Sequence, residues 1–221
     1  MKSSKSGESG TAKAVKKAYH HGALREALVE AAARLASERG VASLSLRETA
    51  RRAGVSQAAP YHYFADKSAL LAAVAEQGFR LFDAMQAAAH EQSPDDPTER
   101  LQALGVAYVR FALDKPHYFR VMFRPHLVEH AKYPGLHEVS RGAFERLVES
   151  TRAARLAHGH DDSDPLTAAT LMWSVPHGLA TLFLDGPISE GTSPRALEAL
   201  ARAATLPLAS ASFDELHASL G

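Results

Sequence analysis

Residues 44–71 read LSLRETARRAGVSQAAPYHYFADKSALL, and this stretch decides the fold. Ser45 and Glu48 have the spacing of a capping box, in which the serine hydroxyl accepts a hydrogen bond from the third amide of the helix. The glutamate carboxylate then reaches back to the serine amide. This pattern predicts a short helix over about 46–53.

A glycine and a second capping residue follow directly. Gly54 ends the first helix, and Ser56 is placed to cap a second one over about 57–64. Pro60 is tolerated there because it lies in the first turn. Two short helices joined at a glycine predict a helix-turn-helix, whose second helix would enter the major groove of DNA.

Helical periodicity continues on both sides of this unit. A preceding helix over about 23–39 is predicted from apolar residues at i, i+4, i+7 and i+11, namely Leu24, Leu28, Ala31 and Leu35. Asp66 is placed to cap a long helix that ends near His90. Further helices are predicted from Leu101 to a stop before Pro116, and at about 117–123, 136–157, 165–184, 194–206 and 211–219. No strand pattern of useful length occurs, so we expect an all-α fold.

The charge is divided between two parts of the chain. The total is zero, but residues 1–75 hold 12 basic and 6 acidic side chains, a net of +6, which leaves −6 for residues 76–221. A basic N-terminal unit is typical of proteins that bind phosphate backbones. We therefore predict a flexible basic arm over 1–20, a DNA-binding domain over 21–67 and a helical domain over 68–221.

Composition excludes several other classes. The 221 residues contain no cysteine, so disulfides, thiolate metal sites and cysteine nucleophiles are absent. No apolar run approaches the ~18 residues of a membrane span, and the Lys-rich start lacks a secretory apolar core. No phosphate-binding glycine loop or Ser/His/Asp order occurs. We expect a cytoplasmic protein that is not an enzyme, needs no cofactor and does not contact membranes.

The second short helix carries side chains that suit DNA. Gln57 can pair with adenine, and the methyl groups of Ala58 and Ala59 can touch thymine while letting the backbone approach. Hydroxyl groups such as that of Tyr61, and the amine of Lys67, suit phosphate oxygens. The alternative is three packed helices that bind nothing, with aromatic residues closing their core.

The sequence resembles the TetR family of bacterial transcriptional regulators over about residues 21–75. The resemblance rests on residues 44–56, LSLRETARRAGVS, followed by residues 61–71, YHYFADKSALL. It implies a homodimer with two helix-turn-helix heads on a pseudo-palindromic double-stranded DNA operator, and an all-helical C-terminal half for dimerisation and effector binding. The DNA-binding residues it implies, together with our own assignments, are Ser43, Ser45, Arg47, Ser56, Gln57, Ala58, Ala59, Tyr61, His62, Tyr63 and Lys67.

The C-terminal half contains an apolar segment over 171–186. Its Trp173, His177 and Gly178 resemble the hallmark of the WHG type of TetR C-terminal domain. Aromatic side chains of this half could line a cavity between helices, where helical bundles commonly bind ligands. The predicted ligand-binding residues are Tyr108, Phe111, Phe119, Met122, Phe123, Trp173 and His177.

The function predicted from these features is sequence-specific DNA binding by a repressor that a small-molecule effector releases. One alternative is a DNA-binding regulator without a small-molecule ligand. A more remote one is a zinc hydrolase, because His126-Leu127-Val128-Glu129-His130 fits the H-x-x-E-H pattern. Against it, the flanking prolines leave room for only about two turns, and no third ligand is identifiable.

Overall fold

The computed structural model describes residues 8–124, 128–160 and 164–210, with side chains from residue 22 onward, and these residues form helices and no strand. The all-α prediction is confirmed. The α-helices are α1 (Glu8–Arg39), α2 (Leu46–Ala53), α3 (Lys67–Glu91), α4 (Pro97–Asp114), α5 (Pro116–Met122), α6 (Pro134–Ala157), α7 (Pro165–Asp185) and α8 (Pro194–Ser210). The 3₁₀ helices are η1 (Val41–Ser43), η2 (Ala59–His62) and η3 (His130–Lys132).

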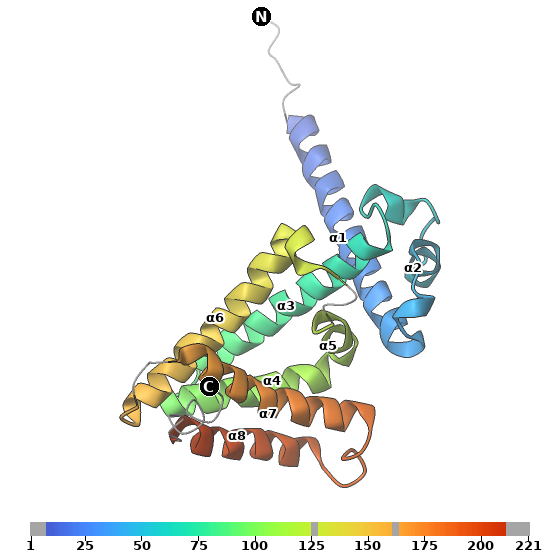
Figure 1. Cartoon of the computed structure of the whole chain (residues 1–221). Coiled ribbons are helices and arrows are strands. Elements are labelled where there is room, and N and C mark those ends of the chain that lie inside the picture. Colours follow the sequence, from blue (N-terminus) through green and yellow to red (C-terminus); the bar gives the residue numbers. More distant parts are fainter. Residues whose placement is uncertain (1–7, 125–127, 161–163, 211–221) are drawn as a thin grey trace, which may run out of the picture.

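The helices form an N-terminal head and a C-terminal body (Figure 1). The head contains α1, α2, η2 and the first turns of α3, and the body contains the rest of α3 and α4–α8. In the body, α3 packs on α4 and α6, and α7 lies beside α8. One core joins both parts, because buried residues of α1 such as Leu28 belong to the same cluster as Val74 and Phe111. No helix in the described part of the chain is long and apolar enough to cross a bilayer.

Short polar side chains start several helices, and those of α2 and α3 do so where the sequence predicts. The Ser45 hydroxyl accepts a hydrogen bond from the Glu48 amide at 3.1 Å, and Asp66 accepts one from the Ala69 amide at 2.8 Å. Asp96 caps α4 in the same way. Each acceptor satisfies an amide that has no partner within its own helix, so these residues fix the first turn.

The first helix is longer than predicted. It begins at Glu8 instead of near residue 23, so the helix includes residues 8–20, which we expected to form part of a flexible arm. The Ala- and Lys-rich sequence over 12–18 explains the difference, since both residues favour helix strongly. The helix predicted over 211–219 lies outside the described residues.

The second helix of the helix-turn-helix also differs from its prediction. Residues 57–64 do not form an α-helix capped by the Ser56 side chain; they form turns and the 3₁₀ helix η2. In an α-helix starting at Ser56, the first intrahelical bond would come from the amide of residue 60, and proline has none. The Ala59 amide bonds to the Ser56 carbonyl instead, at 3.0 Å, which is the 3₁₀ pattern.

Candidate nucleic-acid interface and internal cavity

The residues predicted to bind DNA come from two adjacent segments of the head. Residues 43–47 supply the end of η1 and the start of α2, and residues 56–67 supply the turn after α2, η2 and the start of α3. Tyr61 is the most exposed large apolar side chain among them, at 53%. Ala59, Tyr63 and Lys67 are half-buried, and the remaining predicted residues are exposed.

Several of these side chains also hold the head together. The Ser43 hydroxyl donates to the Gly40 carbonyl at 2.8 Å, and the Lys67 amine donates to the Ala42 carbonyl at 3.2 Å. Tyr63 packs against the core beside Phe64. The exposed side chains of Gln57 and His62, by contrast, have no hydrogen-bond partner among the described residues, so they are available to an incoming molecule.

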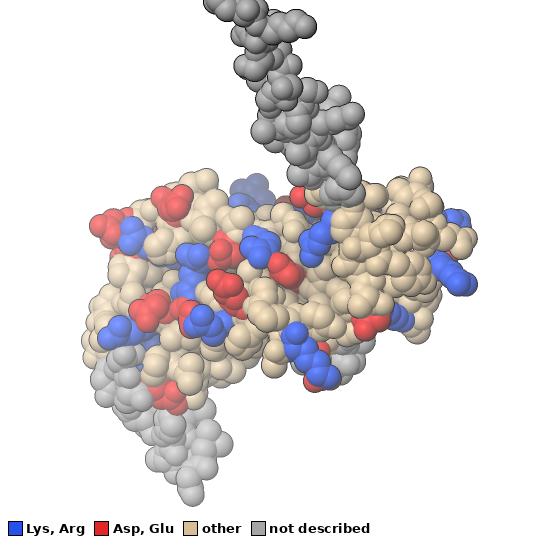
Figure 2. Space-filling view, turned by 90° about the horizontal axis from the view of Figure 1, so that it is seen from above, with Lys and Arg blue, Asp and Glu red and all other residues tan. Residues whose placement is uncertain are grey.

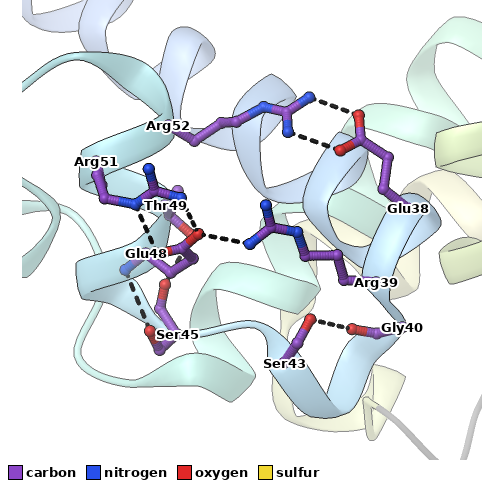
Figure 3. Close-up of polar contacts among 9 residues, drawn as sticks. All are labelled: Glu38, Arg39, Gly40, Ser43, Ser45, Glu48, Thr49, Arg51 and Arg52. Carbon is purple, nitrogen blue, oxygen red and sulfur yellow. Dashed lines mark hydrogen bonds and ion pairs between the residues drawn. The ribbon is translucent and has the colours of Figure 1, made fainter.

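Most arginines of the head are already paired with acidic residues (Figure 3). Arg39 and Arg51 both contact the carboxylate of Glu48, at 3.0 and 2.9 Å. Arg52 binds Glu38 with two hydrogen bonds, one of them 2.6 Å long. These hydrogen bonds lower the pKa of both glutamates. Glu48 therefore does not complete the predicted capping box, because its carboxylate is turned toward the arginines.

Arg47 differs from these arginines. It is exposed on α2, and no described residue forms an ion pair or hydrogen bond with it. It lies in the first turn of α2, where unpaired amides already favour an anion. A phosphate group is the partner that such a guanidinium and helix end bind together.

The positive charge of residues 1–75 is weighted toward the start of the segment. Residues 22–75 hold seven basic and five acidic side chains, a net of +2, so +4 of the total of +6 precedes residue 22. Figure 2 shows basic and acidic side chains close together on the face it presents, without a continuous basic area. Most of the positive charge expected to favour a phosphate backbone therefore lies before residue 22.

The body contains a partly open cavity of about 360 Å³. Residues of α3–α8 and η3 line it, and they are almost all apolar or aromatic. Four of the seven predicted ligand-binding residues contribute to it: Tyr108, Met122, Phe123 and Trp173. This volume falls within the range of small-molecule sites.

The other three predicted residues do not line this cavity. Phe111 is fully buried and packs edge-on against Phe82, with ring centroids 5.3 Å apart. Phe119 and His177 face a second, smaller hollow of about 130 Å³ between α5 and α7. Helical spacing marks which residues are buried, but it does not separate those in the packed core from those beside a void.

Side chains that the sequence analysis missed come mainly from α3. Phe79, Phe82 and Gln86 lie at i, i+3 and i+7, so they share one face of this helix, and all three line the cavity. That spacing is visible in the sequence. It shows a shared helix face, but it does not show whether that face meets a cavity.

A chain of hydrogen bonds joins the side chains of the Trp-His-Gly segment to α4. The Trp173 indole donates to the Tyr108 hydroxyl at 3.1 Å, and that hydroxyl lies 2.7 Å from Nδ1 of His177. The Trp173 contact uses a lone pair of the hydroxyl, which keeps its own proton free to be donated to Nδ1 when that atom is unprotonated. Burial lowers the pKa of His177 and raises that of Tyr108, which keeps both groups neutral.

The segment that fits a zinc hydrolase gives no metal site among the described residues. His126 lies outside them, Val128 and Glu129 are not helical, and His130 begins η3 with its ring edge-on to Phe79. No described cluster of three or more His, Asp or Glu residues could hold a metal ion. The zinc hydrolase alternative is not supported.

Two family models match separate parts of the chain. The model of the tetR family of bacterial regulatory proteins matches residues 28–74, which contain the helix-turn-helix. The model of the tetracyclin repressor-like C-terminal domain matches residues 101–206, which contain α5–α7 and most of α4 and α8. The two matches thus divide between the head and the body.

Solved structures resemble most of the chain, including both the head and the body. A protein with unknown function from Rhodococcus sp. RHA1 is 32% identical, with a TM-score of 0.70, and the match covers 86% of this chain and 96% of that one. The TetR family transcriptional regulator PfmR from Thermus thermophilus is 23% identical, with a TM-score of 0.65 over 82% of this chain and 96% of its own. The fatty acid degradation regulator FadR from Bacillus halodurans is 16% identical, with a TM-score of 0.67 over 84% and 94%. The last two share the fold.

Proposed function

Because this chain belongs to the TetR family of transcriptional regulators and is a DNA-binding regulator, we propose that it is a cytoplasmic, non-enzymatic repressor that a small-molecule effector releases from its operator. One observation supports this proposal above all. The exposed polar face of the head and the apolar cavity of the body are joined by the same helix, α3.

The DNA-binding role is proposed for residues that are not engaged by the protein itself. Gln57 and His62 would contact bases or nearby phosphates, and Arg47 would bind a phosphate at the start of α2. The paired arginines Arg51 and Arg52 keep their guanidinium groups turned toward glutamates. The candidate contacts are therefore chosen by where a side chain lies on the head and by whether the protein already pairs it, more than by the total charge.

Two connections run from the cavity to the head. On α3, Phe79 lines the cavity and Lys67 begins the helix beside the DNA-binding face. On α5, Met122 lines the cavity, while the Tyr118 hydroxyl donates to the Glu30 carboxylate of α1 at 2.9 Å. A molecule that prefers one arrangement of α3 and α5 would shift the head, since only a difference in affinity between two states moves their equilibrium.

A homodimer would bury the apolar surface that α7 and α8 expose. Leu166 and Leu182 of α7 are 59% and 46% exposed, and Leu200 and Leu206 of α8 are 49% and 45% exposed. Between the leucines of α7, a Cβ added to Gly178 would meet nothing within 4 Å, so a partner helix could approach closely there. A second copy using the same surface would place two heads on one pseudo-palindromic operator.

The experiment is selection of bound sequences from a random DNA pool, followed by measurement of affinity against salt for the best operator. Gln57→Ala should relax base choice at one position by ~1–3 kcal/mol. Arg47→Ala should weaken all sequences alike and reduce the salt slope by about one. Arg141→Ala, which removes an equal charge from α6, should change neither.

Three results would contradict the proposal. If no sequence were enriched from the pool, the proposed sequence-specific binding would be wrong. If the salt slope fell equally in Arg47→Ala and Arg141→Ala, the assigned contact between Arg47 and a phosphate would be wrong. If molecules bind in the cavity and none of them changes the affinity for the operator, the alternative of a regulator without an effector is favoured.

A further inference from the structure

The lining of the cavity carries no formal charge. None of its residues is Asp, Glu, Lys or Arg. Its titratable imidazole, His130, has a pKa lowered mainly by burial, so it is neutral at neutral pH. A charged group inside this space would lose its hydration without gaining a partner, which costs much free energy.

Most polar groups around the cavity are already satisfied. The Tyr108 hydroxyl is engaged by Trp173 and His177. The Thr205 hydroxyl donates to the Ala201 carbonyl at 3.0 Å, and the Ser140 hydroxyl donates to the His137 carbonyl at 3.1 Å. These hydroxyl groups therefore have no proton left to donate to a ligand, although the oxygens of Ser140 and Thr205 can still accept one.

Gln86 is different. Its side chain lines the cavity from α3, the residue is only 3% exposed, and its amide oxygen Oε1 has no hydrogen-bond partner in the described part of the chain. A buried acceptor without a donor destabilises the folded protein. This oxygen is covered by neighbouring atoms, so a ligand that supplies the donor would have to turn the side-chain amide toward itself, and the new hydrogen bond would then remove this cost. Gln86 is therefore the candidate residue for specific recognition.

The volume limits the size of the molecule. A protein cavity of about 150 Å³ lined by apolar side chains holds one benzene molecule. The present cavity, at about 360 Å³, is roughly twice as large. Its aromatic walls, which include Phe82, Phe144 and Trp173, suit flat rings.

We infer that the cavity binds an uncharged, mainly apolar molecule about the size of two fused rings, which donates one hydrogen bond to Gln86. This inference rests on the proposed function, because it assigns a chemical class to the effector. It makes Gln86 the residue that selects a hydroxyl- or NH-bearing molecule over an apolar one of the same shape.

Three probes of matched shape test it by calorimetric titration of the full chain: 2-naphthol, 2-methylnaphthalene and 2-naphthoate. The wild type should bind the naphthol about fivefold more tightly than the methyl compound, as expected for one hydrogen bond, and should bind the anion most weakly. Gln86→Leu should lose the preference for the naphthol. The control variant Gln77→Leu makes the same change on α3 outside the cavity lining, and it should keep the preference for the naphthol.

Thermal unfolding without any probe is a second measurement. Gln86→Leu should raise Tm, because it removes a buried amide oxygen that has no partner, whereas a glutamine needed for structure would give a lower Tm. The inference would be overturned if the wild type bound naphthol and methylnaphthalene equally tightly, or bound naphthoate as tightly as naphthol. It would also be overturned if Gln86→Leu kept the preference for naphthol, or if no probe bound.

The same samples separate this inference from the function on which it rests. If 2-naphthol binds through Gln86 but leaves operator affinity unchanged at fixed salt, the effector role fails and the ligand class stands. If the three probes bind equally well and all weaken operator binding, the effector role stands and the assignment of Gln86 fails.

Discussion

The head and the body of this protein are stabilised in different ways. In the head, capping side chains, a glycine turn and surface ion pairs fix short elements within about 30 residues of one another, as with Ser45, Gly54 and the Arg52–Glu38 pair. In the body, aromatic rings from distant helices pack around a cavity. Phe82, Tyr108 and Phe123 meet there, although they come from three different segments.

This difference matches the two tasks that we propose. A DNA-binding face needs fixed positions at the surface, which local hydrogen bonds provide. A ligand site needs an apolar interior with unfilled volume, which only long-range packing creates. Because α3 belongs to both regions, a change in the packing of the body can reach the head.

The largest effect should come from the core of the body. Phe111→Ala removes a fully buried ring that packs against Phe82, and we expect the free energy of unfolding to fall by about 3–5 kcal/mol. Urea denaturation measures it. Tyr61→Ala removes a larger side chain from the exposed face of the head and should change stability by less than about 0.5 kcal/mol. Similar losses in the two variants would show that the regions do not differ as described.

A smaller effect should come from the turn of the head. Gly54 has φ of 70°, in the left-handed region, so Gly54→Ala should destabilise the protein by about 1–2 kcal/mol. Gly142 of α6 has open space at its Cβ position, and Gly142→Ala should stabilise the body by about 0.5–1 kcal/mol. Thermal unfolding of both variants gives the comparison. A stabilising Gly54→Ala would mean that the turn adopts another conformation.

The smallest effect should appear as pH dependence. Burial lowers the pKa of His117, His130 and His177, so the unfolded chain binds more protons than the folded one below about pH 6.5. The stability that depends on these imidazoles staying neutral is fully present above that pH and decreases as pH falls. Tm should therefore decrease from pH 7.5 to 5.5. His177→Gln should reduce this slope. An unchanged or steeper slope in this variant would contradict the assignment.

Sequence patterns predicted the boundaries of most helices because the responsible interactions are local. The starts of α2 and α3 follow from Ser45 and Asp66, whose side chains bond to amides three residues away. The same local rules did not predict η2. Ser56 has the character of a capping residue, but the missing amide of Pro60 removes the bond that would begin an α-helix there.

The sequence by itself determined the all-α class and the helix-turn-helix segment, since caps, turns and periodicity act over a few positions. Only the tertiary structure decided that Glu48 also binds Arg39, that Glu38 binds Arg52 and that Arg47 stays unpaired. It also placed Gln86 beside the cavity and Phe111 in the packed core. These outcomes depend on which helices meet and on how completely their side chains fill the space between them, and no spacing along one helix contains that information.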